Sequence, residues 1–327
     1  MTTLHFMYRM EIDHTETVSR CYFTIKCIPR EDERQHLEKI RLWLKPHPGG
    51  AGYSQGRDSF GNRQIYGCVT EPHRKFVFRA EGEVEILQTG YVERVGGKGT
   101  GAGQAEQIGI FRYPHGKCVP GEGLESYHRS LGLMMPEHAG GGSGLAISGH
   151  AGGGSGLVIP GHVDGSPDLA SPVCACPDAG HSLWGDPDAA FQVCTDLMHR
   201  LHQDFSYVPG ATQVRTTAEE AWGLRKGVCQ DYAHIYITLL RMSGIPARYV
   251  CGLIAGEGAS HAWVEALCGD RWIAFDPTND CLAGDQYIKL GHGRDADDHG
   301  INRGIMWGGG LQTQKIWAQV EAVPADP

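Results

Sequence analysis

The sequence predicts an α+β protein in which an N-terminal antiparallel β-sandwich precedes a domain of helices packed on an antiparallel sheet. Three observations lead to this fold class. Residues 1–95 alternate apolar and polar side chains in short runs divided by turn residues, which is the pattern of strands. Residues 188–242 repeat apolar side chains at helical spacing, and strand-like runs return from 247 onward. A chain of 327 residues is long enough for two such domains.

The N-terminal domain is expected to span 1–95. Short runs, turn signals such as Gly61-Asn62 and almost no helical period favour a sandwich. The strand-like runs are 4–8, 21–28, 37–44, 58–66 and 75–87. A glycine-rich break at 95–103 marks the junction to the next domain. It does not lie between a strand and a helix, as a phosphate-binding loop does, so no nucleotide is expected there.

The second domain is expected to comprise 105–137 and 188–327. A short helix is indicated at 123–131, and a longer one from Asp188 has five apolar residues on one face. These five are Phe191, Cys194, Leu197, Met198 and Leu201. Its strands are expected at 247–254, 260–267, 271–275 and 316–322.

Residues 138–187 are expected to form a flexible glycine-rich insertion. A twelve-residue unit begins at His138 and recurs at His150, and its glycines make ordering costly while few apolar residues offset that cost. The repeated histidines, with Cys174 and Cys176, permit a metal site. Structural zinc sites separate paired cysteines by about two to four residues, whereas one residue separates these two. No metal and no cofactor are therefore expected.

The most informative segment of the chain surrounds a cysteine at a predicted helix start. The helix is expected to begin at Cys229, after Gly227, and to end at Gly244 before Pro246. A thiol in the first turn lies at the positive end of the helix dipole, beside backbone N–H groups without helical partners. Both favour the thiolate form, and the same N–H groups can hold an oxyanion.

A histidine and an aspartate are expected on the two strands of one hairpin, with Gly269-Asp270 as its turn. His261 comes eight residues before Gly269 and Asp276 seven after it, so antiparallel pairing places them roughly opposite each other. The carboxylate can then accept the Nδ1–H of the imidazole and leave Nε2 for a thiol. With Cys229 these residues form a nucleophile, a base and an orienter. Each residue type alone is more often structural, but the three together, in order and on the expected elements, favour catalysis.

Several segments here resemble the transglutaminase-like superfamily of papain-type cysteine enzymes. They are TAEEAW (217–222), GVCQDYAH (227–234), GIPARYV (244–250), SHAWVE (260–265) and DPTN (276–279). The resemblance implies a papain-like transglutaminase core with Cys229 as nucleophile, His261 as general base and acid, and Asp276 as orienter. The N-terminal part looks like the β-rich domain of the bacterial branch, and 291–295 and 302–306 look like its closing segment. Members include crosslinkers, peptidases, amidases and inactive scaffolds, so the resemblance indicates the machinery rather than the substrate.

The resemblance also implies a side-chain donor for the oxyanion upstream of the nucleophile. The candidates are Gln230, Trp222 and Tyr207. Trp222 lies in a helix whose start is marked by a capping box of Thr217 and Glu220, and a core position is the alternative reading.

Four residues are candidates for substrate binding. Trp263 follows the histidine in its strand, whereas His292, Arg294 and Asp295 come in a polar loop after a strand at 287–290. The loop residues could bind a substrate carboxylate or amine, and a solvated loop is the alternative. The spacing of a calcium loop, with its distant glutamate, is missing.

Composition excludes several classes of partner. The 29 basic and 38 acidic residues give a net charge of −9, which argues against a nucleic acid partner. No apolar run approaches the roughly 18 residues of a membrane span, and the first ten residues indicate a strand rather than a signal peptide. Eleven cysteines, odd in number and irregular in spacing, favour reduced thiols in the cytoplasm.

We therefore expect an enzyme that cleaves a peptide or protein amide substrate through a cysteine thioester. Hydrolysis is favoured over transfer to an amine, because water is always present and the sequence indicates no dedicated amine pocket. Two other classes stay open: a scaffold with an inactive site, and a redox or metal protein that uses the surplus cysteines. The presence of all three site residues argues against the scaffold.

Overall fold

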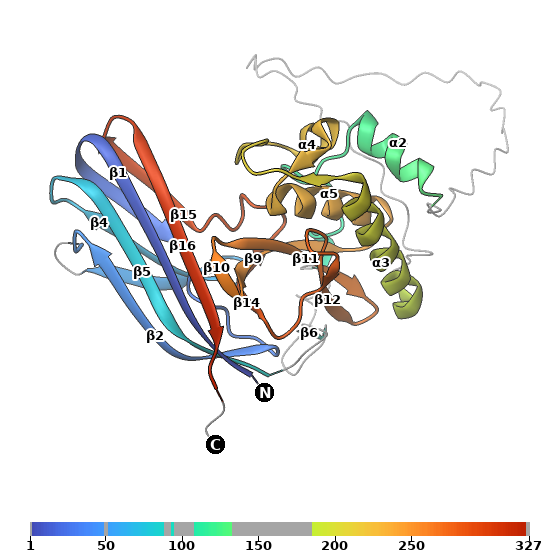
Figure 1. Cartoon of the computed structure of the whole chain (residues 1–327), viewed down its shortest axis with the longest axis horizontal. Coiled ribbons are helices and arrows are strands. Elements are labelled where there is room, and N and C mark those ends of the chain that lie inside the picture. The colour runs from blue at the N-terminus through green and yellow to red at the C-terminus, as the bar shows by residue number, and fades with distance from the viewer. Residues whose placement is uncertain (1, 49–51, 88–92, 95–107, 133–184, 325–327) are drawn as a thin grey trace, which may run out of the picture. The chain divides into compact units, whose positions relative to one another are not determined.

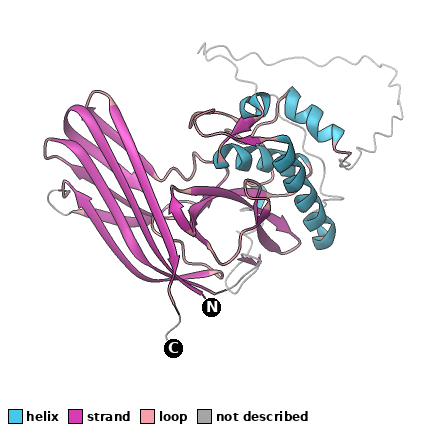
Figure 2. Ribbon diagram, in the orientation of Figure 1, coloured by secondary structure: helices cyan, strands magenta, loops and turns pink. Residues whose placement is uncertain are grey.

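The computed structural model describes residues 2–48, 52–87, 93–94, 108–132 and 185–324. The expected insertion lies outside these residues except at its last positions, and so does the glycine-rich junction. The α+β class with antiparallel sheets is as expected (Figure 1 and Figure 2). No helix within the described ranges is long and apolar enough to cross a membrane.

The N-terminal strands are organised around one long strand, β1 (Thr2–Ile25). Its first half pairs on both sides, with β5 (His73–Ile86) and β16 (Gln312–Ala322). Its second half pairs with β4 (Arg63–Val69) and β15 (Asn302–Gly308), after a register shift near Val18. Hydrogen bonds thus link eight strands into one continuous sheet, which is completed by β2 (Gln35–Lys45), β3 (Tyr53–Arg57) and β10 (Gly256–Gly258).

The last two strands of the chain complete the sheet built around β1. Sequence analysis placed 316–322 in the second domain, but β16 pairs with β1, where Trp317 lies opposite Arg9. The guanidinium of Arg9 lies 5.7 Å from the centre of the Trp317 ring. Pairing between strands about 300 residues apart leaves no signal in a local pattern, which is why the sequence misplaced this strand.

The helices pack around α5 (Cys229–Met242), which is buried along most of its length. Around it are α2 (Glu122–Ser130), α3 (Pro187–Asp204) and α4 (Ala218–Leu224), all expected from the sequence. The stripe on α3 is buried as expected except for Phe191, which is 36% exposed and rests against the ring of Phe275. The capping box of Thr217 and Glu220 opens α4.

The second sheet carries the hairpin that sequence analysis predicted. Its strand order is β13 (Cys281–Leu282), β12 (Arg271–Asp276), β11 (His261–Cys268), β9 (Ala247–Ile254) and β14 (Tyr287–Gly293), with β6 (Glu93–Arg94) beside β12. Gly269 and Asp270 form the turn between β11 and β12, and α5 packs on β9 and β11. A helix end and two strand ends therefore meet at one edge.

Candidate active site

Cys229 is the first residue of α5, with Val228 as its extended N-cap. The carboxylate of Asp231 accepts the Val228 N–H at 2.8 Å and the Thr212 hydroxyl at 2.6 Å, which fixes the start of the helix. Gly227 is required here, because a Cβ atom would lie 2.4 Å from that carboxylate. The thiol is therefore held in a defined place while its side chain stays partly exposed.

The first turn of α5 leaves two backbone donors outside the helical ladder. Tyr232 is the first residue whose N–H reaches back four residues, to the carbonyl of Val228 at 3.1 Å. The N–H groups of Cys229 and Gln230 precede that bond and have no place in the ladder. They lie at the positive end of the helix dipole, so they suit a negatively charged oxygen beside the thiol.

His261 and Asp276 come together across the hairpin. The Nε2 atom of His261 lies 2.7 Å from Oδ2 of Asp276. The register pairs Val264 with Phe275, and one step further Asp276 faces Trp263 and not His261. The two residues are thus offset by two positions from direct opposition, and their side chains meet as diagonal neighbours on one face of the sheet.

The nitrogen that meets the carboxylate also differs from the expectation. Sequence analysis assigned Nδ1 of His261 to Asp276, but Nε2 makes this bond, and Nδ1 is left for the thiol. The far nitrogen of the ring is the one that reaches a diagonal neighbour, which explains the exchange. Cys229 also acts on this ring, since its side chain contributes to the raised pKa of His261.

The charges of this pair favour an imidazolium. Burial alone lowers the pKa of His261, but its bonds to Asp276 and Cys229 outweigh burial and raise that pKa to about 10. Burial likewise raises the pKa of Asp276, yet its hydrogen bonds, led by the one from His261, hold it below its ordinary value. The site thus stabilises positive charge on His261 and negative charge on Asp276.

Asp276 is held by four donors besides the histidine. Its Oδ1 accepts the N–H groups of Thr278 and Asn279, at 3.0 and 3.2 Å. Its Oδ2 accepts the Asn279 amide at 2.7 Å and the Tyr287 hydroxyl at 2.8 Å. Sequence analysis gave no role to Asn279 or to Tyr287. The Asp-Pro-Thr-Asn turn could have indicated Asn279, whereas Tyr287 arrives on a separate strand.

Trp263 is not a substrate contact. Its side chain is fully buried, its ring stacks on His261 with centroids 6.3 Å apart, and Tyr287 meets it edge-on at 5.4 Å. It lies two residues after His261 on β11 and hence on the same face of the sheet. The Trp263 ring therefore packs against the imidazole and helps to hold its position.

The three oxyanion candidates have different surroundings. Tyr207, in the short strand β7 (Ser206–Tyr207), pairs with Gly227 of β8 (Lys226–Gly227) and is half-exposed. Burial and the charge of Cys229 raise the pKa of Tyr207, and its pairing partner Gly227 precedes the thiol by two residues. The Gln230 amide donates to the carbonyl of Val214 at 3.2 Å instead.

Trp222 belongs to the core. It is 2% exposed, and its ring lies against Tyr127 at a centroid distance of 4.1 Å, with the guanidinium of Arg225 on it. The alternative reading of this residue, as a packing residue of the core, is the one that the structure supports.

Two of the three polar candidates at 292–295 are buried. β14 runs three residues further than expected, to Gly293, so His292 is a buried strand residue against Phe60 and Phe111. Asp295 is fully buried, and Arg294 makes a bidentate pair with Asp298. The expectation of an open polar loop is therefore wrong for His292 and Asp295, whereas a role of this cluster in substrate binding stays a prediction.

One group of side chains has the spacing of metal ligands among the residues described. His115, Asp295 and Asp298 offer ligand atoms within 4.8 Å of one another. Both oxygens of Asp298 already accept from Arg294, and Oδ2 of Asp295 accepts from the backbone of Lys117 at 3.1 Å. These hydrogen bonds join the segment that holds Lys117 to the loop that holds Asp295 and Asp298. They account for the short distances between the three side chains.

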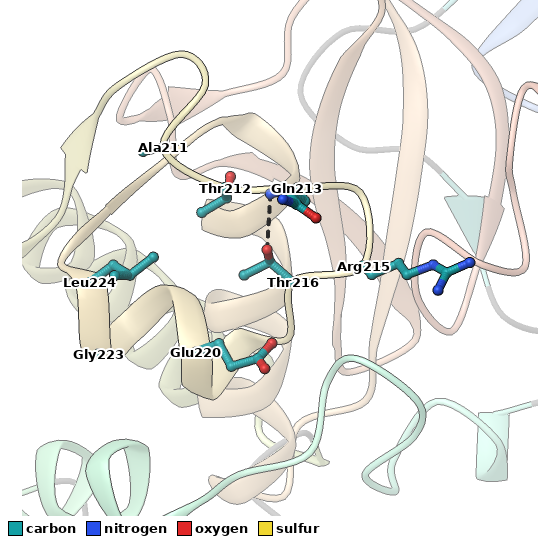
Figure 3. Close-up of a pocket in the computed structure, with 8 residues that line it drawn as sticks. All are labelled: Ala211, Thr212, Gln213, Arg215, Thr216, Glu220, Gly223 and Leu224. Atoms are coloured by element: carbon teal, nitrogen blue, oxygen red, sulfur yellow. Dashed lines mark hydrogen bonds between the residues drawn. The ribbon is translucent and has the colours of Figure 1, made fainter. Parts of the chain in front are cut away.

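A shallow surface pocket of about 640 Å³ lies between the loop 211–216 and α4 (Figure 3). Thr212 lines this pocket and also bonds Asp231, and the same loop accepts the Gln230 amide at Val214. The pocket wall is thereby tied to the first turn of α5.

Comparison with known proteins agrees with this geometry. Residues 181–277 match the model of the transglutaminase-like superfamily, and residues 4–85 match the bacterial transglutaminase-like N-terminal region. An uncharacterised protein of Mycobacterium tuberculosis is 28% identical over 333 residues, which cover 97% of this chain and 91% of the relative. A protein-glutamine gamma-glutamyltransferase of Pseudomonas aeruginosa is 34% identical over 98 residues, covering 25% of this chain and 15% of that protein.

A solved structure shares the fold over nearly the whole chain. It is a crystal structure of a candidate cysteine protease from Cytophaga hutchinsonii, with a TM-score of 0.66 and 18% identity. The match covers 99% of this chain and 92% of that chain. It therefore includes both the sheet around β1 and the helix–sheet core.

Proposed function

The chain belongs to the transglutaminase-like superfamily, and from this premise we propose that it is a thiol enzyme acting on peptide or isopeptide amide bonds. One observation carries the proposal: His261 is hydrogen-bonded to Asp276, and both that bond and Cys229 at the start of α5 raise the pKa of the imidazole. A nucleophile, a base and an oriented carboxylate in contact are what acyl transfer through a thioester requires.

The chemical steps follow from the contacts. Nδ1 of His261 takes the proton of the Cys229 thiol, and the thiolate attacks the amide carbonyl carbon. The tetrahedral oxyanion collapses as the same nitrogen gives its proton to the leaving amine, which leaves a thioester on the sulfur. Water then attacks the thioester as His261 takes its proton, the C–S bond breaks, and His261 returns that proton to the sulfur as the carboxylic acid leaves. Asp276 holds the ring throughout and stabilises its charge.

Stabilisation of the oxyanion falls to the first turn of α5 and to one side chain. The N–H groups of Cys229 and Gln230 are the backbone donors that the helical ladder leaves over. The Tyr207 hydroxyl is the proposed side-chain donor, since its ring is half-exposed and its strand pairs with Gly227, two residues before the thiol.

Hydrolysis is the proposed outcome, and transfer to an amine is the second candidate. Water reaches a partly exposed thioester without a dedicated site. The similarity to a protein-glutamine gamma-glutamyltransferase is what favours the second candidate. The two differ only in the nucleophile that resolves the thioester, so one experiment separates them.

That experiment incubates the protein with a library of peptides containing Gln and Lys and with a primary amine, and follows the products by mass spectrometry. The control is Cys229→Ala. Cleaved or deamidated peptides that disappear in the variant support hydrolysis, whereas amine adducts that disappear support transamidation. Products that persist in the variant would contradict the assignment of the nucleophile. A wild-type protein that changes no peptide favours the scaffold.

A further inference from the structure

We propose that Arg34, a residue of the N-terminal β-domain, is a positioning residue that holds Tyr287 against the Asp276–His261 pair; the inference rests on the proposed function. The sequence suggested no chemistry for this domain. The contacts between the loop 28–35 and the strand β14 give the domain a part in the site.

Arg34 is buried and directed at the start of β14. Its side chain is 1% exposed, and Nη2 donates to the carbonyl of Tyr287 at 3.2 Å and to the carbonyl of Gly284. Its own backbone is fixed by Oδ1 of Asp32 and, through its carbonyl, by the N–H of Leu87 at 2.7 Å. A guanidinium that is buried away from water needs such acceptors, so the position of the Arg34 side chain and that of the Tyr287 backbone are linked.

Gln35 strengthens the same link. It is fully buried, its Nε2 donates to the carbonyl of Lys289 at 2.8 Å, and its Oε1 accepts the N–H of Lys289 at 2.8 Å. One side-chain amide thus bonds both backbone groups of a strand residue, as a neighbouring strand would. β14 is therefore held at two points, two residues apart, by consecutive residues at the start of β2.

Tyr287 carries the link to the reacting groups. Its hydroxyl donates to Oδ2 of Asp276 at 2.8 Å, the same oxygen that lies 2.7 Å from Nε2 of His261. Its ring also lies 6.2 Å from the imidazole and edge-on to Trp263. A shift of the Tyr287 backbone moves the hydroxyl away from the carboxylate, which then loses one of the two side-chain donors that hold Oδ2 beside the imidazole.

A simpler role for Arg34 is to join two domains without effect on the site. The two roles differ in a double-mutant cycle. A positioning residue that acts through Tyr287 has no effect once the hydroxyl is removed, whereas a general structural role persists. The cycle needs a readout at Cys229 that requires no substrate, and alkylation of the thiol provides one.

The experiment measures the rate of alkylation of Cys229 by iodoacetamide across pH, by peptide mass spectrometry, in wild type, Arg34→Met, Tyr287→Phe and the double variant. We expect Tyr287→Phe and Arg34→Met each to slow alkylation near neutral pH by roughly tenfold, the size expected for one hydrogen bond to a charged group. In the Tyr287→Phe background, Arg34→Met should change the rate by less than about twofold.

The matched control is Arg79→Met, since Arg79 lies on β5 of the same domain and pairs with Glu81 at the surface. It should leave the rate unchanged. If Arg34→Met does not fold, Arg34→Lys replaces it in the experiment. This variant keeps the buried charge without the planar fork, and it should slow alkylation relative to wild type by less than the roughly tenfold factor expected for Arg34→Met. The inference about Arg34 would be overturned, and the proposed function would stand, if the Arg34 variant slowed alkylation equally with and without the Tyr287 hydroxyl. A folded Arg34 variant that does not slow alkylation would have the same consequence. A wild-type Cys229 that reacts no faster than Cys281 would overturn the proposed function and the inference with it.

Discussion

Oδ2 of Asp276 lies 2.7 Å from Nε2 of His261, although the two residues are diagonal and not opposite on their hairpin. The carboxylate reaches the ring because a turn and a tyrosine hold it in that direction. Nδ1 is then the nitrogen that remains for Cys229. The imidazole is thus oriented by a group that has little freedom of its own.

Replacing Cys229 with Ala should abolish turnover of any amide or ester substrate and leave the fold intact. The side chain is partly exposed at a helix start, so its removal costs little packing. Activity and thermal unfolding of the same preparation provide the check. Cys281→Ala is the matched control, because this second thiol lies 3.5 Å from the Tyr287 hydroxyl and outside the proposed steps. Residual turnover in Cys229→Ala would contradict the account.

Asp276→Asn should lower kcat by about 10³–10⁴-fold with a small change in KM, as loss of the orienting carboxylate does in related triads. The amide cannot stabilise an imidazolium and favours the wrong tautomer. Steady-state kinetics on a peptide substrate measure the effect. Asp270→Asn, in the exposed turn of the same hairpin, should behave as wild type. A decrease in kcat by a factor of less than about ten would show that the carboxylate does not orient the base.

The contribution of His261 to stability should decrease with rising pH. Its folded pKa of about 10 exceeds the ordinary value of about 6.5 in the unfolded chain. The folded state therefore holds the extra proton between these values, so the contribution is complete below about pH 6.5 and is lost as pH rises through about 10.

Urea denaturation of wild type and His261→Ala at several pH values tests this linkage. The difference in unfolding free energy should be larger near pH 6 than near pH 9.5. His36→Ala, at an exposed histidine, is the control and should show no such trend. A difference that is constant or grows with pH would contradict the charged pair.

Tyr207→Phe should lower kcat by roughly 10²–10³-fold and leave KM nearly unchanged, because an oxyanion donor acts mainly in the transition state. The ring is retained, so substrate packing is preserved. Tyr66→Phe, an exposed tyrosine on β4, is the matched control. Equal kinetics for Tyr207→Phe and wild type would leave the oxyanion to the backbone N–H groups.

Lys289→Met should destabilise the protein by about 3–5 kcal/mol, since it leaves a buried carboxylate without one of its cations. Nζ of Lys289 lies 2.7 Å from Glu265, and both side chains are fully buried. Burial raises the pKa of Glu265, but Arg248 and Lys289 outweigh it and lower that pKa to about 2. Urea denaturation measures the loss. Lys39→Met, at an exposed pair with Glu83, should change little.

The sequence predicted the local parts of this site well. The start of α5 at Cys229, the hairpin turn at Gly269 and the bounds of β9 all follow from patterns within one element. Capping residues, glycines and alternating side chains act over a few positions, and the structure uses them as expected.

The parts that the sequence missed depend on distant pairing. Tyr287 and Arg34 are about 250 residues apart, and nothing local indicates that they meet. The polar residues near His292 were assigned to an open loop because their strand was predicted too short. The cytoplasmic location and the peptide substrate stay predictions.

Acylation of the enzyme by a p-nitrophenyl ester tests the central claim most directly. The account predicts a burst of nitrophenolate of about one equivalent per enzyme, and an acyl group on the peptide that contains Cys229 after acid quenching. Both should vanish in Cys229→Ala. An acyl group on any other residue, or a burst that survives in the variant, would contradict a thioester at Cys229.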